Sequence, residues 1–378
     1  MIDLLDEHRH YVTDARRLEA YRLALAATIR PGDTVLDLGA GTGVLGLLAC
    51  EAGAGRVYAV DDGPALDLAR AIARAGPYAS RVVHVRGHSA WVRLPEPVDV
   101  IVADQVGYFG PEAGFGDDVP VAATRFLGPG GRVVPGSIRL FAAPVSLPEV
   151  RRRMDAWLDV PGVDLSPAVA LERDTARPVS APAAALLSAG VDLGRVDARS
   201  EAPSTFVGAG TVTCDRTGTA DGILGWFEAT LAPGITMTNA PGAPGRIDRA
   251  QLYMPTEGLA LRAGDRLAIR VHVTPGAGVV AWTLEVIDDQ GRARERRQQT
   301  VIDAILFSAP EVARRTAPSH RPVLGPAGQA RLEVLRLCDG RHSVADIERV
   351  LRMRFPDAFP TADAVAAFVA GVLRAHAT

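Results

Sequence analysis

The sequence predicts an α/β domain built on a parallel sheet, followed by an antiparallel β domain and a small helical domain. From Thr34 to Val134, short apolar segments alternate with segments of helical periodicity, which is typical of a parallel sheet covered on both faces. After Pro135, strand-like segments follow one another between Gly and Pro turns, which is typical of an antiparallel barrel or sandwich. Residues 327–378 return to helical periodicity.

We expect a first domain over 1–135, a second over 136–307, a Pro-rich linker over 308–326 and a third domain over 327–378. The first domain opens with a helix over 5–29. Its expected strands are Thr34–Leu38, Arg56–Val60, Val82–Arg86, Val98–Ala103 and Arg132–Val134. Those of the second domain are Ile138–Pro144, Thr205–Cys214, Gly225–Leu231, Arg249–Met254, Arg266–Thr274 and Val279–Ile287. An Ala-rich segment, Pro148–Gly190, is expected as a helical insertion.

Composition and charge exclude several classes of partner. The 378 residues carry 41 basic and 44 acidic side chains, so no global field attracts nucleic acid or an anionic membrane. The N-terminus is acidic where a signal peptide would be basic, and no apolar run reaches the length of a membrane span. Cys50, Cys214 and Cys338 form neither a C-x-x-C pair nor a zinc pattern. We therefore expect a cytoplasmic protein without a metal, nucleic-acid or membrane partner.

The strongest pattern is an apolar strand that ends in a glycine turn, where a helix begins. It reads Val35-Leu36-Asp37-Leu38-Gly39-Ala40-Gly41-Thr42-Gly43. Such a turn lets a ligand approach the backbone, and the helix N-terminus presents free N–H groups. A dinucleotide site would require glycine at the next position, which is Val44. The turn therefore suits a nucleoside with an amino-acid tail better than NAD.

A carboxylate stands at the end of the next expected strand. Val57-Tyr58-Ala59-Val60-Asp61 places Asp61 there. Its two acceptor oxygens can hold both hydroxyls of a ribose. The glycine turn followed by this acid is a far more specific signal than either feature alone.

At these residues the chain resembles the protein arginine methyltransferase family, from about His10 to about Asp303. The family opens with Asp-x-x-Arg-x-x-x-Tyr, matched here by Asp14, Arg17 and Tyr21. The resemblance implies a seven-stranded Rossmann-like class I methyltransferase domain. It also implies the cofactor S-adenosyl-L-methionine (AdoMet), the product S-adenosyl-L-homocysteine (AdoHcy), and a homodimer formed through an arm, for which the segment 148–190 is the candidate.

The resemblance also assigns cofactor residues. Arg17 would clamp the carboxylate of AdoMet with its guanidinium. The segment Arg86–Trp91 would hold the adenine, although Ala90 stands where the family usually has a glutamate. The expected cofactor-binding residues are Tyr11, Arg17, Asp37, Gly39, Ala40, Gly41, Thr42, Gly43, Leu45, Asp61, Asp62, Gly87, His88, Ser89 and Asp104.

The expected acceptor site departs from the family. Arginine methyltransferases carry two glutamates on one loop, because a guanidinium stays cationic up to a pKa above about 12. Here Asp104 stands at the first place, and Ala113 at the second, next to Glu112. Arg246 replaces the His of a Thr-His-Trp element. We therefore expect an acceptor other than arginine, such as an imidazole or a carboxylate. The expected catalytic residues are Asp104, Tyr108, Glu112 and Arg246.

The third domain resembles a PqqD-type winged-helix domain over Leu332–Ile347. Domains of that type bind the leader segment of ribosomally made peptides as an added strand. Ser343 and Asp346 form a plausible helix cap. The alternatives are a winged helix-turn-helix that contacts DNA and a stabilising appendage.

Together these patterns favour a methyltransferase that modifies an N or O atom on a side chain of a ribosomally synthesised precursor peptide, whose leader residues 327–378 would bind. The first alternative is a protein arginine N-methyltransferase in which Asp104 and Glu112 form the acid pair. The second alternative is a DNA-binding regulator that senses AdoMet.

Overall fold

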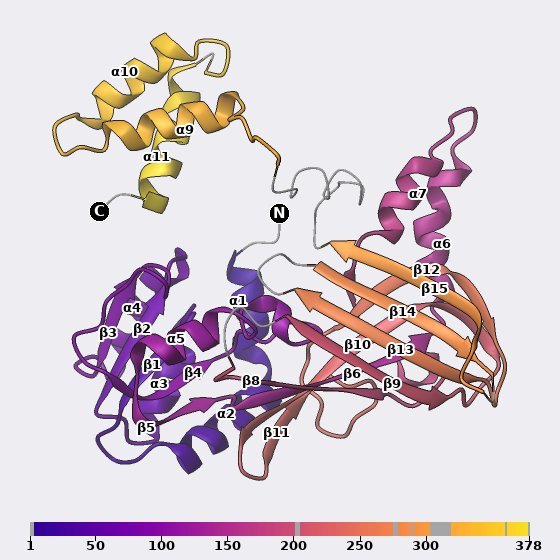
Figure 1. The fold of residues 1–378 in the computed structure, drawn as a ribbon. Coiled ribbons are helices and arrows are strands. Elements are labelled where there is room, and N and C mark those ends of the chain that lie inside the picture. Colours follow the sequence, from indigo (N-terminus) through magenta and orange to yellow (C-terminus); the bar gives the residue numbers. More distant parts are fainter. Residues whose placement is uncertain are drawn as a thin grey trace. The chain divides into compact units, whose positions relative to one another are not determined.

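The computed structural model describes residues 4–200, 205–274, 279–288, 290–302, 319–359 and 361–376. The chain divides into two compact units, Met1–Ala309 and Pro310–Thr378. The first unit holds a parallel sheet and two antiparallel sheets, and the described part of the second is helical (Figure 1). The boundary at residue 135 stays a prediction. So does the linker, of which residues 308–318 lie outside the described residues.

The parallel sheet has the strand order β3-β2-β1-β4-β5. Its strands are β1 Thr34–Leu38, β2 Arg56–Asp61, β3 Val82–Arg86, β4 Val98–Ala103 and β5 Leu127–Val134. Helices α3 (Val44–Glu51), α4 (Ala65–Ala75) and α5 (Asp118–Phe126) pack on its strands, so β1 and β4 are buried along nearly their whole length (Figure 1). The expected mixed α/β class is confirmed.

The described parallel sheet has five strands, whereas the resemblance implied seven. After Pro135 the chain enters β6 (Ser137–Val145), which pairs with β8 and β10 of an antiparallel sheet. The segment that follows β5 therefore leaves the parallel sheet and starts the next layer.

The expected helix over 5–29 is two helices, α1 (Leu4–Thr13) and α2 (Ala15–Thr28). Asp14 separates them with an extended backbone, and its side chain accepts a hydrogen bond from the backbone N–H of Arg17 at 3.1 Å. A short acidic side chain favours this N-cap position. The cap starts α2 so that Arg17 and Tyr21 lie on its buried face.

Two antiparallel sheets follow, with the orders β7-β12-β10-β6-β8 and β15-β14-β13-β9; β11 pairs with β10. Their further strands are β7 Arg177–Val179, β8 Val191–Asp197, β9 Phe206–Thr213, β10 Gly218–Ala232, β11 Ile235–Thr238, β12 Gln251–Leu261, β13 Arg266–Thr274, β14 Val279–Ile287 and β15 Ala293–Ile302. Burial alternates along β13 and β14, as expected when one face of a sheet is solvated. Because β8 contacts β9 and β12 contacts β15, the two sheets meet along both edges.

The expected helical insertion is only partly helical. α6 (Pro148–Asp155), the short η2 (Ala156–Asp159) and α7 (Ser166–Arg173) project from the antiparallel sheets as an arm (Figure 1). The chain then returns as β7, which pairs with β12, and as η3 (Ala183–Ala185). Asp221 anchors the arm, since its buried carboxylate accepts hydrogen bonds from Leu147 N at 2.8 Å and from Arg151 Nη1 at 3.1 Å.

The C-terminal unit contains helices α9 (Pro326–Leu337), α10 (Val344–Arg354) and α11 (Ala362–His376). They share a small apolar core that includes Val334, Ile347, Leu351 and Val369. The cap expected at Ser343 and Asp346 is present as a capping box. Residues 319–359 and 361–376 contain no strand. A winged-helix domain was expected, but these described residues form three helices. They contain no wing and no strand with which a leader peptide could pair.

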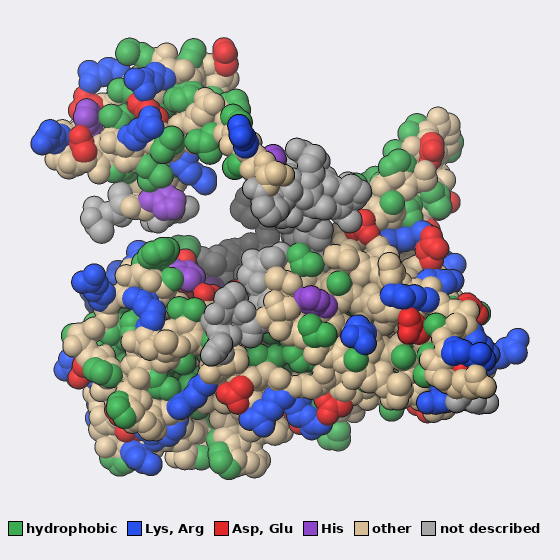
Figure 2. Space-filling model, in the orientation of Figure 1, with side chains coloured by type: hydrophobic (Ala, Val, Ile, Leu, Met, Phe, Trp, Pro, Cys, Tyr) green, Lys and Arg blue, Asp and Glu red, His purple; other side chains and the backbone are tan. Residues whose placement is uncertain are grey.

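Charged side chains are mixed on the visible surface. Figure 2 shows Arg side chains interspersed with Asp and Glu across that face, without a single basic field. Among the described helices, none is both long enough and apolar enough to cross a bilayer.

Candidate functional site

The glycine turn after β1 has backbone geometry that glycine alone tolerates well. Gly39, Gly41 and Gly43 have φ values of +66°, +53° and +77°. A Cβ added at Gly39 would lie 2.9 Å from Nε2 of Gln105, and one at Gly41 would lie 2.9 Å from Cε1 of His8. The turn is therefore covered by a side chain of the loop after β4 and by one from α1.

Asp61 ties the end of β2 to this turn. Its Oδ2 accepts a hydrogen bond from Gly41 N at 2.7 Å, and its Oδ1 accepts one from Gly63 N at 2.6 Å. Each carboxylate oxygen has a second lone pair, so both can still accept a hydroxyl donor. The carboxylate is thereby fixed in place for the ribose role expected from the sequence.

A cavity of about 140 Å³ opens beside the turn. It collects residues from the carboxyl ends of β1, β2 and β3, from the loop after β4, and from the start of α5. Its lining residues are Leu38, Gly39, Val60, Asp61, Asp62, Gly87, His88, Ser89, Gln105 and Asp118. Six of the expected cofactor residues, Gly39, Asp61, Asp62, Gly87, His88 and Ser89, meet here. Their contact with a cofactor stays a prediction.

The other expected residues of the turn do not line this cavity. Ala40, Thr42 and Leu45 are buried. Asp37 is buried as well, and its Oδ2 accepts a hydrogen bond from Gly46 N in α3 at 2.8 Å. Burial raises the pKa of Asp37 to about 7. The contact with Gly46 makes Asp37 a strut between β1 and α3, which differs from the cofactor contact expected for it.

Asp104, at the end of β4, lies between two guanidiniums. Its Oδ2 accepts hydrogen bonds from Nε of Arg17 at 2.6 Å and from Nη2 of Arg249 at 3.0 Å, and Tyr21 OH donates to Oδ1 at 3.2 Å. Burial alone would raise the pKa of Asp104, but Arg249 and Arg17 together lower it. The carboxylate is ionised and its charge is already neutralised, so it offers no unpaired charge to an acceptor. The expected role of Asp104 as the orienting acid stays a prediction, and its described hydrogen bonds come from Arg17, Arg249 and Tyr21.

The cluster of Arg17, Asp104 and Arg249 carries one net positive charge. The Arg17 and Arg249 side chains are 5% and 8% exposed. Both guanidiniums also lie over the ring of Tyr11, at 5.8 and 5.5 Å from its centroid, and Arg17 Nη1 donates to Tyr11 O at 3.0 Å. A buried surplus of positive charge favours a bound carboxylate, which is the role expected of Arg17.

Glu112 is the second acid of the loop after β4, in the short helix η1 (Pro111–Ala113). Its Oε1 accepts a hydrogen bond from Phe109 N at 2.7 Å, while its Oε2 is buried without a partner among the described residues. A Cβ added at Gly107 would lie 2.2 Å from Cδ of Glu112, so glycine is required beneath the carboxylate. Burial raises the pKa of Glu112.

Two further expected catalytic residues lie apart from Asp104. The Tyr108 side chain is 39% exposed, and its backbone carbonyl accepts a hydrogen bond from Asn239 Nδ2 at 2.7 Å. Arg246 precedes β12, and its Nη1 is buried without a partner in the described part of the chain. Neither residue contacts the Asp104 carboxylate through a described hydrogen bond.

Sequence reasoning missed Arg249, Gln105, Asp118 and His8. Arg249 is separated from Asp104 by 145 residues, so no local pattern could join them. Gln105 and Asp118 could have been noticed because they flank a strand end and a helix start. The Oε1 atom of Gln105 is buried without a partner in the described residues, which marks a place for a ligand donor.

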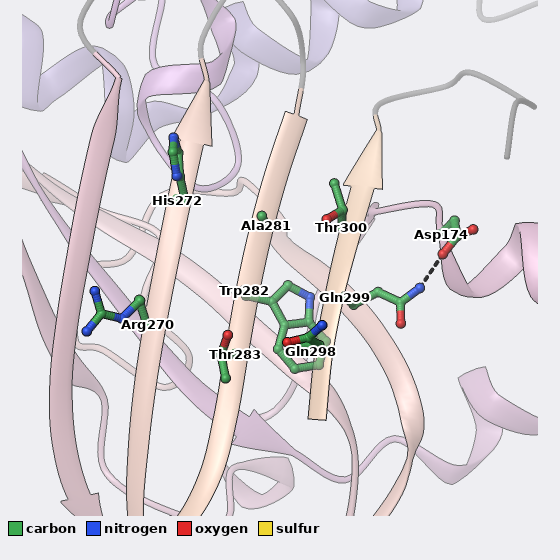
Figure 3. A pocket seen from close by; sticks show the side chains of 9 residues that line it. All are labelled: Asp174, Arg270, His272, Ala281, Trp282, Thr283, Gln298, Gln299 and Thr300. Carbon is green, nitrogen blue, oxygen red and sulfur yellow. Dashed lines mark hydrogen bonds between the residues drawn. The ribbon is translucent and has the colours of Figure 1, made fainter. Parts of the chain in front are cut away.

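A separate cavity of about 440 Å³ lies on the sheet β15-β14-β13-β9 (Figure 3). Arg270, His272, Thr283 and Gln298 are among its lining residues, and Gln299 bonds Asp174 beside it. It shares no lining residue with the cavity beside the glycine turn. We assign it no part in methyl transfer.

The comparisons with known proteins agree with the first part of the chain. Residues 18–106 match the family model of ribosomal protein L11 methyltransferase (PrmA). The chain is 33% identical to probable protein arginine N-methyltransferase 6 of Arabidopsis thaliana over 172 residues, which cover 45% of this chain and 40% of that protein. It is 35% identical to protein arginine N-methyltransferase 6 of Xenopus tropicalis, over 42% of this chain and 48% of that one. The chain thus spans less than half the length of these relatives.

Solved structures share the fold over a longer stretch. The Trypanosoma brucei PRMT1 enzyme-prozyme heterotetrameric complex with AdoHcy aligns at a TM-score of 0.70 and 21% identity, covering 78% of this chain and 97% of that one. Arabidopsis thaliana protein arginine methyltransferase 10 aligns at 0.67 and 24% identity, covering 78% and 96%. These similarities support a class I AdoMet methyltransferase that resembles the protein arginine methyltransferases, with AdoMet as its cofactor.

The hypothesis of ribosomal-peptide modification is wrong. The relatives and structural neighbours are named as arginine N-methyltransferases, and nothing in them supports a precursor-peptide partner. The alternative of arginine methylation fits better.

Proposed function

We propose that the protein is an AdoMet-dependent protein arginine N-methyltransferase. The observation that carries this proposal is the buried carboxylate of Glu112, whose Oε2 has no described partner, in the same loop as Gln105 of the cofactor cavity. A buried carboxylate oxygen without a donor is costly. A guanidinium, with five N–H donors and a permanent charge, supplies both the missing hydrogen bond and the counter-charge.

The described residues fit AdoMet. Gly39 of the turn lines the cavity with positive φ, and Asp61 is fixed beside the cavity for a ribose. The net positive cluster of Arg17, Asp104 and Arg249 suits the carboxylate of an amino-acid tail. When bound, AdoMet supplies a methyl group on a sulfonium. Buried Glu112 would orient the arginine nitrogen and hold its positive charge away from that nitrogen.

Atoms and charge balance in this reaction. A new bond joins the arginine nitrogen to the methyl carbon, the bond from that carbon to sulfur breaks, and its electron pair leaves with AdoHcy. The methylated nitrogen then releases a proton. The proton passes to water, and no strong base is needed, because the nitrogen that has just gained a methyl group is strongly acidic and the product guanidinium is cationic like the substrate.

Mass spectrometry tests this proposal. The purified protein is incubated with AdoMet and an arginine-containing peptide, and with a matched peptide in which lysine replaces each arginine. We expect one or more methyl groups on arginine in the first peptide and none in the second. A methyl group on another residue type would overturn the assignment. Absence of any product, together with a salt-dependent DNA gel shift, would favour the AdoMet-sensing regulator instead.

The arm is our candidate for a homodimer interface. Its apolar side chains Trp157, Leu158, Val160 and Val163 are 43%, 54%, 41% and 54% exposed. Such a cluster on a projecting element is typical of an interaction surface. The structural neighbour from Trypanosoma brucei is described as a heterotetrameric complex, which shows that a protein of this fold assembles.

Leu158→Glu combined with Val163→Glu is expected to convert the dimer into a monomer, because each change buries a charge in the proposed apolar contact. Sedimentation velocity measures the mass. Val207→Glu is the matched control, since Val207 is 55% exposed on β9 and outside the arm. A wild-type monomer, or an arm variant that stays dimeric, would contradict the interface.

The proposed compartment is the cytoplasm. Cys50, Cys214 and Cys338 are free thiols in the structure, and Cys50 and Cys214 are buried. Free thiols persist in a reducing compartment.

A further inference from the structure

The segment Arg86–Trp91, which is expected to hold the adenine of the cofactor, contains no acidic residue. Gly87, His88 and Ser89 line the cavity there, and the next residue is Ala90. Adenine presents an amino group as a donor beside a ring nitrogen as an acceptor. A site that distinguishes adenine from other bases therefore needs an acceptor for that amino group.

Asp118 brings a carboxylate to this cavity from another element. It is the first residue of α5 and lines the cavity with His88 and Ser89. Asp61 and Asp62 line the cavity from the end of β2. The acidic residues of the cavity therefore come from two elements, the end of β2 and the start of α5. Asp61, at the end of β2, is already the residue expected to bind the ribose.

His88 orients the Asp118 carboxylate. The backbone N–H of Ala90 donates to Nδ1 of His88 at 3.2 Å, so in the neutral ring the proton sits on Nε2. That Nε2 lies 3.4 Å from Oδ1 of Asp118. The histidine thus lies beside one carboxylate oxygen as its ion-pair partner. The other oxygen, Oδ2, lies 3.2 Å from where a Cβ of Gly114 would stand, so glycine leaves it room.

The Asp118 carboxylate has spare acceptor capacity. Among the described residues, its polar contact is the ion pair with His88, whereas both oxygens of Asp61 accept backbone N–H groups. The Asp118 side chain is 32% exposed, and burial raises its pKa. A partly buried carboxylate with few hydrogen-bond donors around it is stabilised when a ligand supplies another donor.

We propose that Asp118, positioned by His88, accepts a hydrogen bond from the 6-amino group of the cofactor adenine. This rests on the proposed function only in that the ligand is AdoMet. Asp118 then determines base specificity, and the acid missing from the segment after β3 is supplied by the N-terminus of α5.

Isothermal titration calorimetry with two ligands tests this proposal. One ligand is AdoHcy, and the other is its 6-deamino analogue, in which hydrogen replaces the amino group. Asp118→Ala is expected to weaken AdoHcy binding roughly 10- to 100-fold and to leave binding of the analogue within about twofold. Asp118→Asn, which keeps the shape and a neutral acceptor, should fall between the alanine variant and the wild type.

Two control variants separate specificity from folding. His88→Ala should weaken AdoHcy binding less than Asp118→Ala, because the carboxylate remains, and should weaken the analogue by a smaller factor than AdoHcy, because His88 also lines the cavity. Asp117→Asn changes the neighbouring acid, which caps α5 and lies outside the cavity lining, so both affinities should stay unchanged. Thermal unfolding of the unliganded variants checks that each is folded.

The outcomes distinguish failure of the AdoMet assignment from failure of the role proposed for Asp118. If the wild type binds neither ligand, the AdoMet assignment fails. If it binds AdoHcy but Asp118→Ala and Asp118→Asn weaken both ligands by the same factor, the role of Asp118 is refuted while the cofactor stands.

Discussion

Replacement of Glu112 by Gln is expected to lower kcat with an arginine peptide about 10²- to 10³-fold, while the AdoHcy dissociation constant stays unchanged. Gln keeps the volume and can still accept from Phe109 N, but it removes the negative charge that, in the proposed function, pairs with the substrate guanidinium. Methylation rates measured at saturating AdoMet give kcat, and calorimetry gives the affinity. Retention of the wild-type rate would rule out Glu112 as the acid.

Glu96→Gln is the matched control. Glu96 precedes β4, and its carboxylate accepts a hydrogen bond from Tyr58 OH at 2.8 Å. It lies at the amino end of the strand whose carboxyl end leads to the site. We expect the same peptide assay to give the wild-type rate for this variant.

The pH profile gives a second readout for Glu112. Its pKa is raised by burial, so the carboxyl is still neutral at a pH where an exposed glutamate is ionised. Because the ionised form is the one that binds a guanidinium, kcat/KM should fall as the pH drops through the raised pKa. That acid limb should disappear in the Gln variant. The contribution of Glu112 to fold stability has the opposite sign, since it is full at low pH and is lost as the pH rises through the same pKa.

Gly39→Ala is expected to weaken cofactor binding, with a loss in AdoHcy affinity on the order of 100-fold, or about 3 kcal/mol. The new Cβ would lie 2.9 Å from Gln105 Nε2, at a glycine that lines the cavity. An L side chain at φ +66° also adds about 1–2 kcal/mol of backbone strain. Calorimetry with AdoHcy and thermal unfolding measure the two effects separately.

Gly130→Ala isolates the strain. Gly130 has φ +70°, and a Cβ added there would meet no atom within 4 Å. It should lower thermal stability by a similar amount and leave AdoHcy affinity unchanged. Equal affinity losses in both variants would show that the turn at Gly39 does not form the cofactor site.

The local parts of the site could be predicted from the sequence. The glycine turn and Asp61 lie within one strand-helix-strand unit. Because β1 and β2 are parallel neighbours, the turn after β1 and the acid at the end of β2 lie side by side. The cap at Asp14 was not predicted, because the expected helix ran unbroken over 5–29, although a short acidic side chain there is compatible with an N-cap. Short-range hydrogen bonding determines features of this kind.

The long-range parts could not be predicted in the same way. Asp104 looked like a free acid because the sequence does not show that Arg249, 145 residues further along the chain, bonds to it. The strand β7 has three residues, too few to show an alternating pattern, so it was absorbed into a helical insertion. In the C-terminal unit the helices were predictable from periodicity, whereas the expected strands rested on resemblance alone.

Asp104 pairs with two guanidiniums, Arg17 and Arg249, that come from different parts of the chain. Arg17 comes from the N-terminal helices, Asp104 from the parallel sheet and Arg249 from the antiparallel layer. A fragment cut after residue 135 would keep the glycine turn but would lose Arg249, and with it the net positive charge of the cluster around Asp104. The antiparallel layer therefore supplies one of the two guanidiniums that hold Asp104, so the electrostatics at the end of β4 depend on a residue outside the parallel sheet.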